Sequence, residues 1–180
     1  MGTTTTLLTF EEFERLPDQP GKRELLDGEL IELPPAELNH NQIAQTIFLR
    51  LYAALSAAHA RGEAGQLGEA YHEMGYKLSG HGWVQPDISL THAGQAAGKY
   101  LVNAPGIAIE VVSPINTAEA METKVAIYFR HGAREVWRVY PKTRTVVVHV
   151  GATARTETET VTTPLLPGFT LNIAEILGTN

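Results

Sequence analysis

One carboxylate lies where the sequence predicts burial. Glu110 stands within residues 107–112, a run whose other members are small or β-branched apolar residues, typical of a central strand covered on both faces. A buried carboxylate without a partner is costly, so it either takes up a proton or needs a nearby cation. The run therefore predicts a metal ion or a lysine beside Glu110. A structural ion pair with an arginine is the alternative, although perturbed buried charges often mark functional sites.

A lysine lies in the apolar stripe of the helix predicted over residues 117–131. The residues three and four positions from Lys124 share its helix face, and they are Ala120, Met121, Ile127 and Tyr128. A lysine in such a stripe usually extends outward to water, and it stays inside only if an anion lies opposite. Because Glu110 is on the strand just before this helix, we expect Lys124 and Glu110 to meet. Glu119 and Glu122 are expected to face solvent.

A second carboxylate stands on the strand predicted over residues 84–91. Asp87 shares the polar face of this strand with Gln85 and Ser89, since side chains alternate between the two faces. A single aspartate on a polar strand face is often only solvated, and this interpretation stays open. The pair Pro86-Asp87, upstream of Glu110, favours a shared site.

A mixed sheet with helices packed on it is needed to bring these residues together. The elements expected before Glu110 are a short helix capped by Thr9, a hairpin turning at Asp27-Gly28, a helix over 38–61 and strands over 71–78 and 84–91. Those after it are a helix that begins with a capping box of Asn116 and Glu119, strands over 135–140 and 145–150, and an exposed edge strand or mobile loop over 156–160. This order predicts an α/β class, an α+β mixed sheet flanked by helices, in one domain over residues 1–180.

Composition excludes several kinds of protein. The chain has 180 residues, 43% of them hydrophobic, which suits one full-sized core. The absence of cysteine excludes disulfides and thiolate zinc sites. His72-Glu73 has no second histidine at the spacing of a zinc protease. Neither a signal peptide nor a bilayer-length apolar run is evident, so a soluble cytoplasmic protein without membrane contact is expected.

The net charge of −6 is unusual for a protein that grips a polyanion. The basic groups that could form a DNA track lie mainly in the second half of the chain: Lys124, Arg130, Arg134, Arg138, Lys142 and Arg144. An ordinary solvated face is an equally good interpretation of these residues.

Several segments together resemble the PD-(D/E)XK nuclease superfamily and, more narrowly, the Uma family of bacterial endonucleases, which is abundant in cyanobacteria. The matching segments, in the order of the family, are Arg23-Glu24-Leu25-Leu26-Asp27-Gly28-Glu29, Asn39-His40, Gln85-Pro86-Asp87, Ile109-Glu110-Val111-Val112-Ser113-Pro114, Lys124 with Tyr128, and Glu135-Val136-Trp137-Arg138-Val139. Each motif alone is weak, whereas the set covers nearly the whole chain.

The resemblance implies a restriction-endonuclease-like fold with Asp87 and Glu110 as ligands of a divalent metal. It implies that Lys124 is the catalytic lysine, moved onto the helix, because Val112 stands where the strand form of the motif has its lysine. Glu24 would reach the same site from the hairpin.

Other members of the predicted site have smaller roles. The backbone carbonyl of Val111 is a further candidate metal ligand, and His40, Gln85 and Tyr128 are accessory candidates. Carboxylate and carbonyl oxygens suit Mg²⁺ or Mn²⁺.

The resulting hypothesis is a metal-dependent endonuclease that hydrolyses phosphodiester bonds in DNA and acts as a homodimer. An alternative is a catalytically inactive nuclease-fold module that binds DNA or a protein partner. A third is a structural protein in which Glu110 and Lys124 form only a buried salt bridge.

Overall fold

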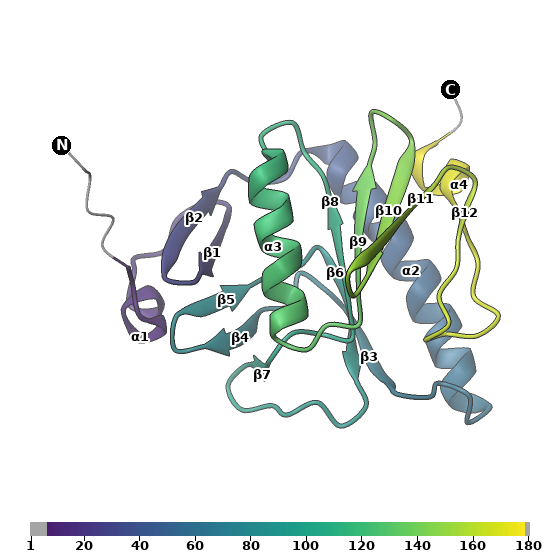
Figure 1. Cartoon of the computed structure of the whole chain (residues 1–180), viewed down its shortest axis with the longest axis horizontal. Helices are drawn as coiled ribbons and strands as arrows, with labels where there is room; N and C mark the ends of the chain where they lie inside the picture. Colours follow the sequence, from purple (N-terminus) through teal and green to yellow (C-terminus); the bar gives the residue numbers. More distant parts are fainter. Residues whose placement is uncertain (1–6, 179–180) are drawn as a thin grey trace.

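Two β-sheets meet in the structure, a computed structural model that describes residues 7–178 (Figure 1). The six-stranded sheet has the order β11-β10-β9-β8-β6-β3, and the five-stranded sheet has the order β2-β1-β5-β4-β7. The first consists of β3 (Leu67–His72), β6 (Ile88–His92), β8 (Ile107–Val111), β9 (Glu135–Tyr140), β10 (Thr145–Val150) and β11 (Thr153–Glu157). The second consists of β1 (Lys22–Leu26), β2 (Glu29–Leu33), β4 (Tyr76–Ser79), β5 (Gly82–Val84) and β7 (Leu101–Val102).

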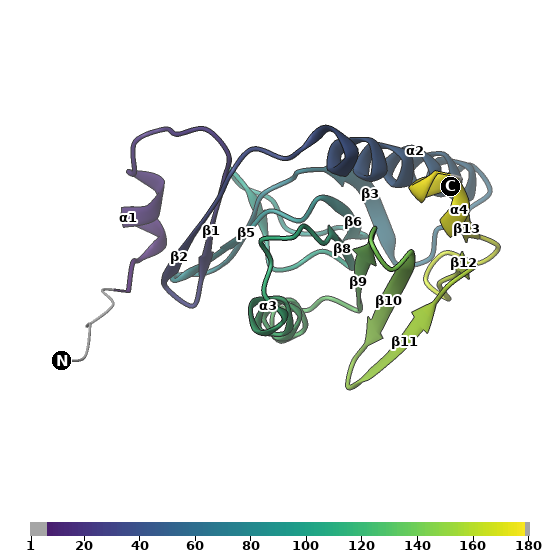
Figure 2. The ribbon, with the colours of Figure 1, turned by 90° about the horizontal axis from the view of Figure 1, so that it is seen from above.

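The two long helices cover opposite faces of the six-stranded sheet. Figure 2 shows α2 (Leu38–Ala60) on one side and α3 (Ala118–Arg130) on the other. The short helices α1 (Phe10–Glu14) and α4 (Ile173–Leu177) lie near the two ends of the chain, and a small ribbon pairs β12 (Thr160–Val161) with β13 (Leu171–Asn172). The predicted mixed sheet flanked by helices is confirmed. Within residues 7–178, none of the helices combines the length and apolar character needed to span a bilayer.

Strand β8 lies inside the larger sheet, antiparallel to β6 and parallel to β9. Its alternate residues pack into two different cores. Ile107, Ile109 and Val111 join the cluster under α2, and Ala108 joins the cluster under α3. Glu110 shares the face of Ala108 by strand alternation, so it points toward α3.

The hairpin turn has the predicted geometry. Asp27 has φ 50° and Gly28 has φ 91°, so both central residues are left-handed as the Asp-Gly pair predicts. The turn fixes the register of β1 against β2, in which Glu24 pairs with Ile31. This register leaves Lys22 and Glu24 on the same face of β1.

The two strands predicted between residues 71 and 91 are wrong, because each is divided between the two sheets. After His72 the chain turns at Glu73, whose φ is 50°, and Gly75 lies so close to the Trp83 ring that it has no room for a Cβ atom. The chain then enters β4 of the other sheet. The second strand breaks at Pro86, which has no N–H to donate to a sheet.

The start of α3 also differs from the prediction. Thr117, not Asn116, is the N-cap residue, and its side chain accepts a hydrogen bond from the Ala120 amide. The Asn116 Oδ1 atom instead accepts a hydrogen bond of 2.8 Å from the Ser113 amide and closes the preceding turn. The Thr-Glu segment begins in the edge strand β11, so the edge-strand interpretation is confirmed for Thr156 and Glu157.

Side chains of β8 alternate between two cores, and substitution of Ile109 tests whether its side chain lies in the core under α2. The Ile109→Ala variant should lose about 2–5 kcal/mol of unfolding free energy, because the side chain is fully buried and its removal leaves a cavity. Urea denaturation followed by circular dichroism measures the loss. The Leu38→Ala variant, at an exposed site at the start of α2, should change stability by less than about 0.5 kcal/mol. Equal effects at both sites would contradict the assigned core.

Candidate active site

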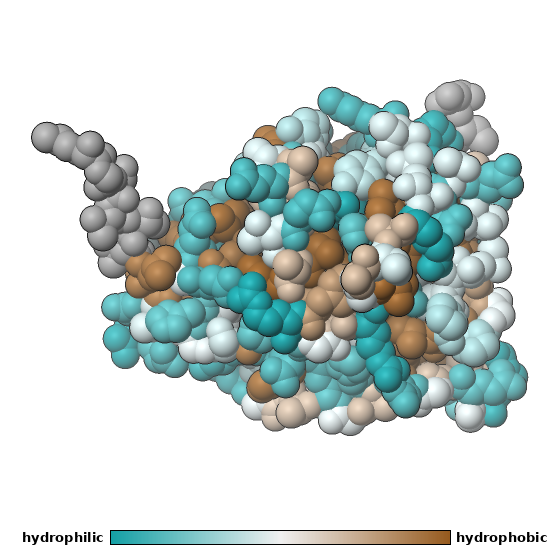
Figure 3. All heavy atoms as spheres, in the orientation of Figure 1, coloured by the Kyte–Doolittle hydropathy of each residue, from teal (hydrophilic) through white to brown (hydrophobic). Residues whose placement is uncertain are grey.

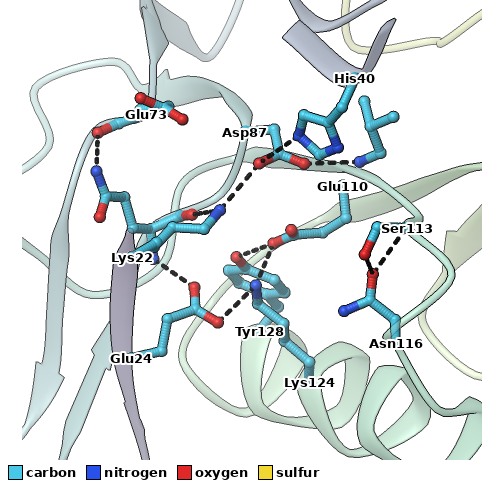
Figure 4. A network of polar contacts seen from close by, with 12 residues as sticks. Lys22, Glu24, His40, Glu73, Asp87, Glu110, Ser113, Asn116, Lys124 and Tyr128 are labelled. Atoms are coloured by element: carbon cyan, nitrogen blue, oxygen red, sulfur yellow. Dashed lines mark hydrogen bonds and ion pairs between the residues drawn. The ribbon is translucent and has the colours of Figure 1, made fainter. Parts of the chain in front are cut away.

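A pocket of about 830 Å³ opens between the two sheets. Its walls are the β1–β2 hairpin, the first turn of α2, the loop after β8 and the loop after β9. Charged side chains line its inner end: Lys22, Glu24, Asp87, Glu110 and Lys124 (Figure 4). Except for Lys22, which is partly exposed, each of these residues is at most 6% exposed.

The Lys124 ammonium group lies between two buried carboxylates. Its Nζ atom is 2.8 Å from Glu110 Oε1 and 2.8 Å from Glu24 Oε2. The predicted contact with Glu110 is therefore present, and Glu24 reaches the same lysine from the hairpin. The Tyr128 hydroxyl, one helical turn after Lys124, donates a hydrogen bond of 2.6 Å to Glu110 Oε1. Three elements, β1, β8 and α3, are joined at this point.

Asp87 is held by a different set of groups. Lys22 Nζ lies 2.9 Å from its Oδ1 atom, and His40 Nε2 lies 3.3 Å from the same oxygen. The Val111 amide donates a hydrogen bond of 2.8 Å to Oδ2. Asp87 is only 3% exposed, so the interpretation of a merely solvated aspartate is wrong.

Gln85 connects the two groups of charges through its backbone. Its amide donates a hydrogen bond of 2.8 Å to Glu24 Oε1, and its carbonyl accepts one of 2.8 Å from Lys22. The Gln85 side chain donates a hydrogen bond of 2.8 Å to the Glu73 carbonyl. The contacts of Gln85 with Glu24 and Lys22 are thus made by its main chain.

Burial and charge act against each other in the site. Burial lowers the pKa of Lys124, but the carboxylates of Glu110 and Glu24 outweigh it and raise the pKa above its usual value. Burial raises the pKa of the Glu110 carboxyl, so its ionised form needs the ammonium beside it. Burial, followed by the charge of Glu110, raises the pKa of Tyr128, and its hydroxyl therefore remains a donor.

The second pair of charges behaves differently. Burial raises the pKa of Asp87, but Lys22 and His40 together lower it well below its usual value. The hydrogen bond to Asp87 raises the pKa of His40. Asp87 is therefore ionised throughout the neutral range.

Lys22 was not predicted as a member of the site. It stands two residues before Glu24 on β1, so strand alternation alone would have placed both side chains on one face. The signal was available but weak, because a lysine at the start of a hairpin strand is usually solvated.

Val111 contacts the site through its backbone amide, which donates to Asp87. The Val111 carbonyl, which was predicted from the sequence as a candidate metal ligand, is not part of this hydrogen bond.

The basic residues expected to form a DNA track differ in how available they are to a ligand. Lys124 and Arg138 are buried, Arg130 pairs with Asp27, and Arg144 binds the backbone carbonyl of Gly178. Figure 3 shows hydrophilic side chains interspersed with hydrophobic ones on the face that α3 covers. A DNA track from the second half of the chain stays a prediction, for which Arg130, Arg134 and Lys142 are the exposed candidates.

A family model described as "Putative restriction endonuclease", Uma2, matches residues 10–174. The chain belongs to the Uma2 family. Among curated proteins, none matches the chain significantly. In structure the chain is similar to "a putative nuclease belonging to DUF820" from Anabaena variabilis, with 20% identity, a TM-score of 0.79 and coverage of 94% of this chain and 97% of that chain. At that identity the likeness shows the fold, which is consistent with the expected restriction-endonuclease-like fold.

The donor chemistry of this Uma2 site fits a hard divalent cation. Asp87 and Glu110 offer carboxylate oxygens at the inner end of one pocket, and Gln85 adds a backbone carbonyl that already binds a cationic group. The ammonium groups of Lys22 and Lys124 already contact two of these carboxylate oxygens. Within residues 7–178, no three His, Asp or Glu side chains are grouped closely enough to hold an ion by themselves. Binding therefore needs backbone oxygens or water, together with movement of a lysine.

The charge at Lys124 provides a test of the buried network. The Lys124→Met variant keeps the volume of the side chain but leaves Glu110 and Glu24 without their shared cation, so the unfolding free energy should fall by about 3–5 kcal/mol. Urea unfolding at neutral pH measures the fall, and Lys142→Met, at an exposed lysine of the same pocket, is the matched control.

A further variant separates the charge from the packing. Adding Glu110→Gln and Glu24→Gln to Lys124→Met removes the unpaired charges and should restore part of the lost stability. If Lys124→Met were as stable as the control, the central ion-pair network would be contradicted.

Proposed function

We propose that the chain is a metal-dependent endonuclease that hydrolyses phosphodiester bonds in DNA, with Mg²⁺ or Mn²⁺ as its cofactor. The observation that carries the proposal is the buried Lys124 between Glu110 and Glu24, beside Asp87, at the inner end of an open pocket. Buried charged groups with shifted pKa values that line a pocket are a common feature of active sites. The family description supports the choice of DNA as substrate.

Asp87 and Glu110 are the residues that would hold the metal ion, and the Val111 carbonyl remains a proposed ligand. When bound, the ion lowers the pKa of a coordinated water and offsets negative charge on the phosphate. The Val111 amide and His40 orient the Asp87 carboxylate through its two oxygens. Tyr128 fixes Glu110 by donating to one of its oxygens.

Lys124 is the residue proposed to act on the phosphate. An ammonium group has three N–H donors, of which two are directed at Glu110 and Glu24. The third has no partner among residues 7–178, so it could donate to a phosphate oxygen or to the attacking water in the pocket and stabilise the developing negative charge. Glu24 is a positioning residue in this scheme, because it holds Lys124 while accepting the Gln85 amide.

A homodimer is part of the proposal, since two copies of the site are needed to cut both strands of a duplex. The outer face of α2 exposes Leu49 and Tyr52, which makes it the preferred contact. Sedimentation at micromolar concentration measures the association of the chain and its loss in the Tyr52→Glu variant.

One observation favours a catalytically inactive binding module as the alternative function. Two lysine ammonium groups already balance much of the charge of three carboxylates without any added ion. Calorimetric titration with Mn²⁺ separates the two functions, since the endonuclease should bind the ion and the inactive module should not. The Asp87→Asn variant, which lacks one carboxylate charge, is the control for binding at this site.

Cleavage of plasmid DNA tests the endonuclease directly. In Mn²⁺, wild-type protein should nick or linearise the plasmid, whereas Asp87→Ala and Lys124→Ala should lose about 100-fold or more of the rate. Glu63→Ala, at an exposed site at the far end of α2, should retain the wild-type rate. Circular dichroism of each variant verifies folding. Equal cleavage by wild type and by both site variants would assign the activity to a contaminant and refute the assigned residues.

A further inference from the structure

Lys22 makes contacts of the kind a metal ion would make. Its ammonium group lies 2.9 Å from Asp87 Oδ1 and 2.8 Å from the Gln85 carbonyl oxygen. One is a carboxylate oxygen and the other a backbone carbonyl oxygen, and hard divalent cations take both types as ligands. A positive group thus already occupies the cation position beside Asp87 (Figure 4).

The two lysines of the site are not equivalent. Lys124 lies between two carboxylates, is 6% exposed and has the Tyr128 ring beside it. The Lys22 side chain is 17% exposed, lines the open pocket and contacts a single carboxylate. A flexible four-carbon stem lets its ammonium group leave Asp87 without disturbing the backbone of β1. Of the two lysines, Lys22 is therefore the one that an incoming ion can displace.

We propose that Lys22 is a built-in counter-cation of Asp87, which a divalent metal ion must displace in order to bind, so that Lys22 sets the metal affinity of the site. The inference rests on the proposed function, because it requires a metal ion at Asp87. Its physical basis is that a divalent ion repels an ammonium group that occupies the same position between Asp87 and the Gln85 carbonyl, so the ion binds there only as the ammonium group leaves. In the metal-free protein, Lys22 stabilises a carboxylate that would otherwise be buried without a cationic partner on that side.

His40 also contacts the shared oxygen, at 3.3 Å. Its ring is only partly buried, and it approaches from the first turn of α2 rather than from the side of the Gln85 carbonyl. Of these two groups, only Lys22 contacts both oxygens of the cation position, so the displacement is assigned to Lys22 and not to His40.

The test compares Lys22→Met with wild type and with Lys142→Met, which removes the same charge from an exposed lysine of the same pocket. The full-length chain is titrated with Mn²⁺, and electron paramagnetic resonance measures the free ion. Lys22→Met should bind Mn²⁺ about tenfold more tightly than wild type, and Lys142→Met should change the affinity much less. Adding Asp87→Asn to Lys22→Met should abolish the gain.

Stability provides a second readout that does not depend on activity. Without metal, Lys22→Met should unfold at a lower urea concentration than wild type, and saturating Mn²⁺ should remove the difference. Lys22→Gln retains an N–H donor for Asp87 while lacking the charge, so it tests the same idea if the methionine variant does not fold. It should also bind Mn²⁺ more tightly than wild type.

The outcomes separate the inference from the proposed function. If Lys22→Met and Lys142→Met gain affinity equally, or if Lys22→Met binds more weakly than wild type, the displacement is refuted while the metal site remains. If neither wild type nor the Lys22 variants bind Mn²⁺, the metal-dependent function and the displacement both fail.

Discussion

The ion pairs of one lysine hold the two sheets of this protein together at the site. Lys124 forms ion pairs with Glu24 of the five-stranded sheet and Glu110 of the six-stranded sheet. Lys124 itself lies on α3, which packs against residues of both sheets. Both carboxylates are buried, and removal of this cation would leave them without their shared ion-pair partner. The arrangement of hairpin, central strand and α3 is therefore as much an electrostatic requirement as a packing one.

Charge balance connects this network to the proposed function. Three carboxylates face two ammonium groups and a histidine, so a small change in position of one lysine exposes oxygen ligands of the kind that divalent ions bind. Lys124 and Lys22 differ in their surroundings. Lys124 is enclosed by its ion-pair partners, whereas Lys22 is partly exposed to the pocket.

The sequence was most informative where a charged residue interrupts an apolar pattern. Glu110 in a β-branched strand predicted a nearby cation, and Lys124 in an apolar helix face predicted a nearby anion; the two form an ion pair. The Asp27-Gly28 turn was predicted because both of its central residues need positive φ. Lys22 was missed because a lysine on a hairpin strand carries no such contradiction. The division of strands between the sheets was missed as well, since it depends on close packing of Gly75 against Trp83, two residues that only the fold brings together.

The interruption of the strand at Pro86 has a consequence for how the chain folds. Asp87 stands where the chain passes from one sheet to the other, and its partners come from positions as distant in sequence as Lys22 and Val111. Such contacts close long loops, and closing them costs more chain entropy than forming the local hairpin. The site therefore has no local precursor in the sequence, because its residues meet only when both sheets are in place.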